Sequence, residues 1–352
     1  MRNACITAIE YYLPEQKLTN HELAGLFSGR TPEEIAHKTG VSSRSVAAEE
    51  ECCSDLGVTA AQKAFASGTC TPDDIDFLLF CTETPDYFFP ATACLAQARL
   101  GIPVSAGALD FNLGCSGFVY GLGLAKGLIQ TGQANRVLLI TADLLSRFIG
   151  ATDRAARAVF GDAGAATIIE AVDSDDEIGL GSFVYGTDGR GAEHFILREG
   201  ALRGLSSNHQ KPSGGAGLPA LKMNGQKIME FAIGTVPDQI RRLLTRAELS
   251  IADVDLFVFH QSSRYVLEML RHILHIPEEK FFISLEDCGN TVSSTIPVAL
   301  RRASGEGKLL PGHTVVTCGY GVGLSWGASI LKWTPLKVQN VMKTDVPALV
   351  AG

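Results

Sequence analysis

Residues 108–122, Ala-Leu-Asp-Phe-Asn-Leu-Gly-Cys-Ser-Gly-Phe-Val-Tyr-Gly-Leu, place one thiol between a predicted strand and a predicted helix. The apolar residues 108–111 predict a short strand, Gly114 predicts a turn, and the nearly uncharged segment from Ser116 onward predicts a helix buried on most sides. Cys115 then lies at a helix N-terminus, where free backbone N–H groups and the helix dipole favour a thiolate and can hold an oxyanion. This position is typical of a nucleophile, and an ordinary buried cysteine fits the same pattern.

The composition of the 352 residues is that of a globular protein, with 46% hydrophobic residues and enough length for two core-forming units. A net charge of −8 argues against nucleic-acid binding, because basic side chains supply that affinity. No apolar run is long enough for a membrane span, and residues 1–10 lack the apolar core of a secretion signal. Nine cysteines, an odd number, fit free thiols in a reducing compartment. We therefore expect a cytoplasmic protein with no nucleic-acid partner and no membrane span.

An alternating strand–helix pattern occurs twice along the chain. Segments 72–81, 108–115, 136–141 and 165–170 are matched, in the same order and at similar spacing, by segments 251–260, 280–290, 313–318 and 328–332. Such a duplication predicts an α/β protein with two pseudo-symmetric halves, residues 1–174 with the nucleophile and residues 175–352. The polar, glycine-rich residues 204–218 predict a surface loop.

The expected pseudo-two-fold axis brings equivalent points of the two halves together. Cys115 and Asn290 precede helices at such points, and His260 ends a strand, where open α/β sheets place their sites. Cysteine, histidine and asparagine together predict covalent catalysis by sulfur, with imidazole and amide as hydrogen-bond donors or proton carriers. Papain-like proteases use the same three residue types, but neither the repeat nor the glycine-rich segment 319–327 resembles those enzymes.

Several motifs taken together resemble the β-ketoacyl-acyl-carrier-protein synthase III family of the thiolase superfamily. They run nearly end to end, in family order and spacing, and comprise residues 11–15, 39–41, 114–118, 161–165, 260–263, 289–291 and 319–327. The resemblance implies a thiolase-like fold with its two halves in a layered αβαβα arrangement. It also implies a reaction that needs neither a metal nor another cofactor.

The resemblance implies a two-step reaction. Cys115 first takes an acyl group from a thioester, either an acyl-CoA or an acyl-carrier protein. Malonyl-carrier protein then binds, and His260 and Asn290 hold its thioester oxygen while CO2 departs and the carbanion attacks the acyl group, giving a 3-oxoacyl thioester. The backbone N–H groups of Cys115 and Val322 would form the oxyanion hole.

A substrate pocket and a homodimer are further implications of the resemblance. Phe89, Leu145 and Met229 match acyl-pocket positions, with Phe89 reaching in from the other subunit. The remaining substrate-binding candidates, which the resemblance places beside CoA or in the glycine-rich loop, are Arg154, Gly321 and Gly323.

Two residues depart from the family pattern. Glu34 stands where housekeeping members carry a tryptophan that stacks on the adenine of CoA, and Glu230 stands where a lysine helps to dock the carrier protein. A carboxylate beside a polyanionic ligand should weaken CoA binding, which favours a carrier protein as the acyl donor. Alternatives to condensation are acyl transfer that forms an ester or amide, a thiolase-type reaction without decarboxylation, and a non-catalytic partner subunit.

Overall fold

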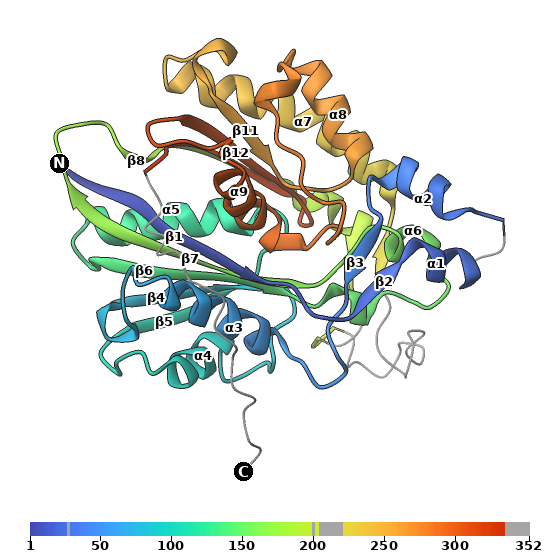
Figure 1. The fold of residues 1–352 in the computed structure, drawn as a ribbon, viewed down its shortest axis with the longest axis horizontal. Helices are drawn as coiled ribbons and strands as arrows, with labels where there is room; N and C mark the ends of the chain where they lie inside the picture. Colours follow the sequence, from blue (N-terminus) through green and yellow to red (C-terminus); the bar gives the residue numbers. More distant parts are fainter. Residues whose placement is uncertain (27–28, 199–200, 204–220, 335–352) are drawn as a thin grey trace.

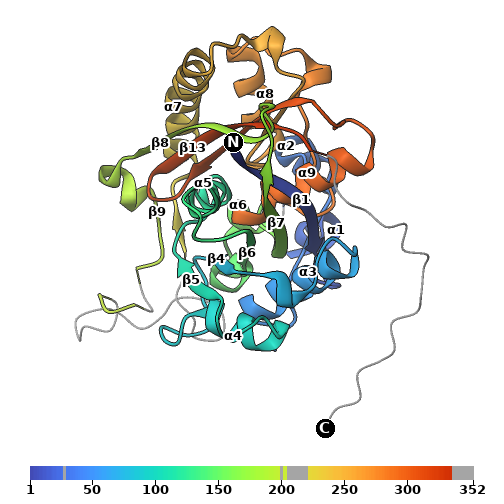
Figure 2. The same cartoon turned by 90° about the vertical axis from the view of Figure 1, so that its left-hand side faces the viewer.

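The structure is a computed structural model that describes residues 1–26, 29–198, 201–203 and 221–334. Residues 204–218, for which the sequence predicts a surface loop, lie outside these ranges. Figure 1 shows two sheets, one above the other, with helices between them and further helices on both outer faces. Figure 2 shows the same layers end-on. This is the αβαβα arrangement of a thiolase-like fold, as predicted.

The first sheet belongs to the N-terminal half and has the strand order β1-β7-β6-β4-β5. Its strands are β1 (Arg2–Tyr12), β4 (Phe77–Cys81), β5 (Gly107–Phe111), β6 (Arg136–Asp143) and β7 (Ala163–Asp173). β4 is parallel to β5 and β6, whereas β7 is antiparallel to β6 and β1. β4 and β6 are almost completely buried, as their continuous apolar runs predict.

The second sheet has the order β11-β12-β13-β8. Its strands are β8 (Gly179–Thr187), β11 (Leu256–Phe259), β12 (Thr314–Gly321) and β13 (Ser325–Lys332). β11 is parallel to β12 and the other pairs are antiparallel, so these strands correspond in order and direction to β4, β6, β7 and β1. The predicted boundary after residue 174 falls in the connection between β7 and β8; as a division into two domains it stays a prediction.

The expected counterpart of β5 in the second half is much shorter than the sequence predicts. Residues 280–284 form only one parallel bridge, between Phe281 and Phe257 of β11. The Gln261 side chain bonds the backbone groups that follow this bridge. Its amide nitrogen donates to the Phe282 carbonyl, and its oxygen accepts from the Ser284 N–H at 2.7 Å. A side chain thus replaces part of the ladder that a full strand would form.

Two helices fill the space between the sheets, α5 (Gly117–Gln130) and α9 (Thr295–Gly305) (Figure 1). α3 (Cys53–Ala66) and α4 (Thr92–Leu100) cover the outer face of the first sheet, and α7 (Gly225–Arg246) and α8 (Arg264–Ile273) cover that of the second. The shorter elements are β2 (Lys17–Thr19), α1 (Asn20–Leu26), α2 (Pro32–Thr39), β3 (Ser43–Ser45), α6 (Arg154–Arg157), β9 (Phe195–Ile196) and β10 (Lys222–Met223). Within the described ranges, no helix is long and apolar enough to cross a lipid bilayer.

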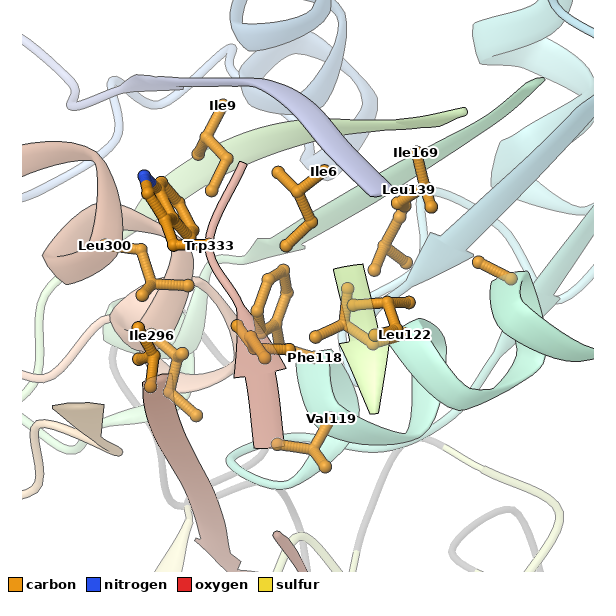
Figure 3. Close-up of a cluster of buried hydrophobic side chains, with 14 of the residues drawn as sticks. Ile6, Ile9, Phe118, Val119, Leu122, Leu139, Ile169, Ile296, Leu300 and Trp333 are labelled. Carbon is orange, nitrogen blue, oxygen red and sulfur yellow. The ribbon is translucent and has the colours of Figure 1, made fainter. Parts of the chain in front are cut away.

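One apolar core joins the two halves through the central helices. Phe118 and Leu122 of α5 are completely buried, and they share a cluster with Ile6 of β1, Ile296 of α9 and Trp333, which follows β13 (Figure 3). Because this cluster draws on both sheets and on both ends of the described chain, it fixes the position of α5 and hence of the cysteine that precedes it.

Replacing Phe118 by alanine is expected to lower the free energy of unfolding by about 3–5 kcal/mol, because the side chain is fully buried and its loss leaves a cavity. Chemical denaturation measures the change. Gln130, which is exposed at the end of the same helix, is the matched control, and Gln130→Ala should stay within about 0.5 kcal/mol. A loss below about 1 kcal/mol for Phe118→Ala would contradict the described packing.

Candidate active site

Cys115 lies between β5 and α5, and only 5% of its surface is exposed. The end of β12 packs closely against Cys115. A side chain on Gly321 would place its first carbon only 2.7 Å from the Cys115 Sγ, so there is room for glycine alone at this position. A side chain on Gly319 would lie 2.6 Å from the Cys115 carbonyl oxygen. These two glycines of the glycine-rich segment therefore let a strand of the second half reach the cysteine of the first half.

His260 follows β11 and is almost completely buried. Its backbone N–H donates to the Cys318 carbonyl of β12 at 2.7 Å, and its Nδ1 lies 2.7 Å from the Thr295 hydroxyl at the start of α9. Burial lowers the pKa of His260 to about 3, although a hydrogen bond to the Val292 carbonyl acts in the opposite direction. The imidazole is therefore neutral at neutral pH.

Asn290 is fixed by bonds on three sides. Its backbone N–H donates to the Val159 carbonyl at 2.8 Å, and its own carbonyl accepts from the Gly161 N–H at 3.0 Å. The side-chain oxygen accepts from the Val292 N–H at 2.9 Å, which directs the amide nitrogen towards His260, 3.5 Å from Nε2. The amide N–H2 group and the imidazole thus face the same space.

The thiol, the imidazole and the amide meet around the end of β12. Gly321 packs on Cys115, and the Tyr320 ring meets the His260 ring edge-on at 5.4 Å between centroids. Val292, bonded to the Asn290 side chain, belongs to the same buried cluster as Cys115. The sequence predicts that Cys115, His260 and Asn290 converge, and the structure brings them together; their catalytic roles stay a prediction.

Burial decides the protonation of Cys115. It raises the pKa of the thiol well above its ordinary value, and the nearby carboxyl groups of Glu83 and Asp143 raise it further. The backbone N–H groups of Val322 and Cys115 lower the pKa, but by less. The sequence-based expectation of a thiolate is therefore wrong for the resting protein, because burial outweighs the N–H groups at the helix N-terminus. The same two N–H groups remain the predicted oxyanion hole.

Alkylation of Cys115 by iodoacetamide should still be rising at pH 10, without the midpoint near pH 8.5 of an ordinary cysteine. A raised pKa means that less thiolate is present at any given pH below it, so the rate keeps increasing as the pH rises. Peptide mass mapping follows Cys115 and the exposed Cys94 in the same samples, and Cys94 reports the reagent's access to the protein surface. A plateau for Cys115 below pH 9 would contradict this assignment.

A cavity of about 730 Å³ opens beside the cysteine. Its walls include Leu145, Phe195, Leu221 and Val322, which pack in the cluster that contains Cys115. Glu83 also lines the cavity, and sequence reasoning missed it. It lies just beyond the carboxyl end of β4, which is the signal that could have identified it.

Of the predicted substrate-binding residues, Leu145 lines this cavity. Met229 and Arg154 are not among its lining residues, and Arg154 lies exposed at the start of α6. Phe89 is 86% exposed in this single chain. Gly323 follows β12 with a φ of 133°, a backbone conformation that favours glycine.

Glu34 and Glu230 are both engaged locally. Glu34 completes a capping box at the start of α2, accepting from the Thr31 N–H at 3.0 Å while its own N–H donates to the Thr31 hydroxyl. Glu230 accepts from Lys227 at 2.8 Å and from Gln226 at 2.9 Å, and these bonds lower the pKa of its carboxyl. Glu34 therefore serves the helix on which it lies.

Comparison with known proteins gives consistent matches along the chain. The family model for 3-oxoacyl-[acyl-carrier-protein] synthase III matches residues 109–189, and the model for the C-terminal part of that family matches residues 244–333. A β-ketoacyl-[acyl-carrier-protein] synthase III of Caldanaerobacter subterraneus subsp. tengcongensis is 34% identical, covering 92% of this chain and 96% of the relative. The chloroplastic synthase III of Arabidopsis thaliana is 36% identical, covering 91% of this chain and 80% of the relative.

Solved structures agree with these relatives. A crystal structure of a 3-oxoacyl-(acyl-carrier-protein) synthase III has a TM-score of 0.90 at 43% identity, covering 94% of this chain and all of that one. The synthase III of Pseudomonas aeruginosa has a TM-score of 0.86 at 30% identity, covering 95% of this chain and 99% of its own.

The fold and the site together define a condensing acyltransferase of the thiolase-like class. The relatives cover nearly the whole chain at more than 30% identity. The chain belongs to the β-ketoacyl-[acyl-carrier-protein] synthase III family.

Proposed function

We propose that this enzyme acylates Cys115 from a thioester and condenses the acyl group with malonyl-carrier protein, releasing CO2 and a 3-oxoacyl thioester. The observation that carries the proposal is the convergence of Cys115 with the His260–Asn290 pair at the end of β12. A nucleophile alone would support simple acyl transfer. The paired imidazole and amide add a site that can hold a second thioester oxygen while a carbanion forms.

In the first half-reaction the Cys115 sulfur attacks the donor's carbonyl carbon and the donor thiol leaves. The Cys115 thiol must lose its proton. The neutral imidazole of His260 can accept this proton and pass it to the departing donor sulfur, which leaves as a thiol, so His260 ends the half-reaction neutral. The N–H groups of Cys115 and Val322, which favour negative charge on the sulfur, would hold the oxyanion.

In the second half-reaction, His260 and Asn290 hold the thioester oxygen of malonyl-carrier protein. The bond to the carboxylate breaks, CO2 leaves, and the carbanion attacks the acyl carbon on Cys115. The Cys115 sulfur then departs and takes up one proton from solvent, which restores the thiol. Donation from His260 Nε2 requires its proton on that nitrogen. The Thr295 hydroxyl, 2.7 Å from Nδ1, would then turn from the Val292 carbonyl, to which it donates at 3.1 Å, and donate to Nδ1. Asn290 donates from the amide nitrogen that faces Nε2.

The donor is an acyl-CoA or an acyl-carrier protein. Glu34 offers no aromatic face to an adenine, and its carboxylate is exposed at the start of α2. Both properties favour a carrier protein over CoA, because CoA carries several phosphate charges.

A homodimer is supported by the edge of the first sheet. β5 pairs only with β4 among the described strands, so its other edge is open. Four apolar residues that lie near β5 in the fold or in sequence are exposed, namely Phe89, Leu109, Leu124 and Tyr185. Phe89 would then enter the partner's acyl pocket, and light scattering of the purified protein tests the oligomeric state. All nine cysteines are free thiols, which supports a cytoplasmic location.

A panel of acyl-CoA and acyl-carrier-protein donors, followed by intact-protein mass spectrometry and CO2 release from malonyl-carrier protein, tests the proposed reaction. Condensation predicts acyl mass on Cys115 and CO2 release that depends on that acylation. Acyl mass with transfer to a hydroxyl or amine and without CO2 would favour the ester- or amide-forming alternative. A 3-oxoacyl product from two acyl thioesters without CO2 would favour a thiolase-type reaction.

A further inference from the structure

Glu83 places a carboxyl group in the wall of the cavity beside the nucleophile. It follows β4 by two residues, and its carboxyl occupies the space that a side chain on Gly114 would need. Gly114 is the neighbour of Cys115, and Leu145, Phe195 and Val322 supply apolar wall nearby. The carboxyl group therefore lies close to where the first carbons of an acyl group on Cys115 would be.

The Glu83 side chain has no partner in the described part of the chain. Its backbone N–H donates to Asp143 at 2.8 Å, and Asp143 also accepts from the N–H and the hydroxyl of Ser293, so the buried Asp143 carboxylate is well satisfied. Within residues 1–26, 29–198, 201–203 and 221–334, the Glu83 carboxyl oxygens form neither a hydrogen bond nor an ion pair. Because Glu83 lines the cavity, a molecule bound there can supply these hydrogen bonds.

We propose that Glu83 selects acyl groups that carry a hydroxyl on one of the first carbons beyond the thioester, by hydrogen bonding to that hydroxyl. This inference rests on the proposed function and names the substrate class of the same site. A plain alkyl chain would displace water from the carboxyl group and return no hydrogen bond, which disfavours its binding. The hydroxyl of a hydroxylated chain replaces the lost hydrogen bond to water. The site therefore discriminates against plain alkyl chains, because they leave the Glu83 carboxyl group without a hydrogen-bond partner.

The protonation of Glu83 fits a hydroxyl better than an ammonium group. Burial and the neighbouring Asp143 raise the pKa of the Glu83 carboxyl, so the neutral form is favoured near neutral pH. A neutral carboxyl group both donates and accepts a hydrogen bond, as a hydroxyl does, whereas an ammonium group requires a carboxylate.

Rates of Cys115 acylation with matched four-carbon thioesters test the proposal. Butyryl-CoA is compared with 2-, 3- and 4-hydroxybutyryl-CoA, and intact mass gives the second-order rate constant for each. We expect at least one hydroxylated donor to exceed butyryl-CoA by about 10-fold or more in the unmodified protein. Glu83→Leu should remove or reverse this ratio, and Glu83→Gln, which keeps both a donor and an acceptor, should retain most of it.

Asp86→Asn is the matched control. Asp86 lines the same cavity, but its carboxylate already accepts from the Ser54 N–H at 2.9 Å, so this variant should leave the hydroxyl-to-alkyl ratio unchanged. Melting temperatures of all variants confirm that they are folded.

Two results would overturn the inference. The first is an unmodified protein that acylates with butyryl-CoA as fast as with every hydroxylated donor. The second is a Glu83→Leu variant that slows all donors equally, which would place Glu83 in the chemistry of the thiol. If none of these CoA thioesters acylates Cys115, the same four acyl groups are offered on acyl-carrier protein. Failure of both series overturns the proposed function, and calorimetric binding of the same thioesters to the Cys115→Ala protein decides the inference separately. Equal affinities there would overturn it.

Discussion

Replacing Cys115 with alanine is expected to lower the rate of condensation by at least about 10³-fold, because it removes the atom that carries the acyl group between the two half-reactions. The remaining groups could still bind a malonyl thioester, so slow CO2 release without condensation is the expected residual activity. The fold should be unaffected, because Cys115 contributes one small side chain to a cluster of larger apolar groups.

Two measurements check this expectation. Intact-protein mass spectrometry should show no acyl mass on the Cys115→Ala protein with any donor, and a radiolabelled malonyl thioester should yield no 3-oxoacyl product. Cys94→Ala, which removes an exposed thiol, is the control and should react as the unmodified protein does. Acyl mass that survives in Cys115→Ala would show that another thiol is the nucleophile.

Replacing Asn290 with alanine is expected to separate the two half-reactions. Acylation of Cys115 should change little, whereas condensation should fall by about 10²–10³-fold, because one of the two donors to the developing enolate oxygen is lost. The backbone bonds of Asn290 to Val159 and Gly161 do not depend on its side chain, so the local structure should persist.

Rapid-quench measurement of acyl-enzyme formation and steady-state CO2 release test the separation in a single preparation. The acylation rate is the internal control for folding and for access to the cavity. A parallel fall of both rates would mean that the Asn290 side chain mainly holds Val292 and the site structure in place. His260→Ala should affect CO2 release in the same way, since its imidazole faces the same space.

The duplication explains why the sequence alone predicts so much of this site. Strand segments with continuous apolar residues and a helix without early charges mark β4, β6 and α5, and their repetition predicts that Cys115 and Asn290 meet. The capping box of Thr31 and Glu34 is also readable from the sequence as Thr-Pro-Glu-Glu. Local patterns therefore predict the elements and their order.

Two kinds of property were not predictable from these local patterns: how deeply a side chain is buried, and toward which side of a helix it points. The raised pKa of Cys115 comes from burial by segments distant in sequence, which a motif does not report. Met229 was expected in the pocket, but its neighbour Ile228 packs against the cluster of Cys115, and one residue along a helix turns the side chain by about 100°. The short bridge at Phe281 depends on the Gln261 side chain, which no periodicity reveals.

The packing of Trp333 against the same cluster as Ile6 has a consequence for biosynthesis. Thr334 also donates its hydroxyl proton to the Ile6 carbonyl at 2.6 Å. These contacts of β1 can form only after residues more than 300 positions later have been synthesised. Such long sequence separations slow folding. A nascent chain that stops short of β13 would leave uncovered the part of the apolar face of β1 that Trp333 shields. Chaperones could bind this part, and their release is expected to follow completion of the chain.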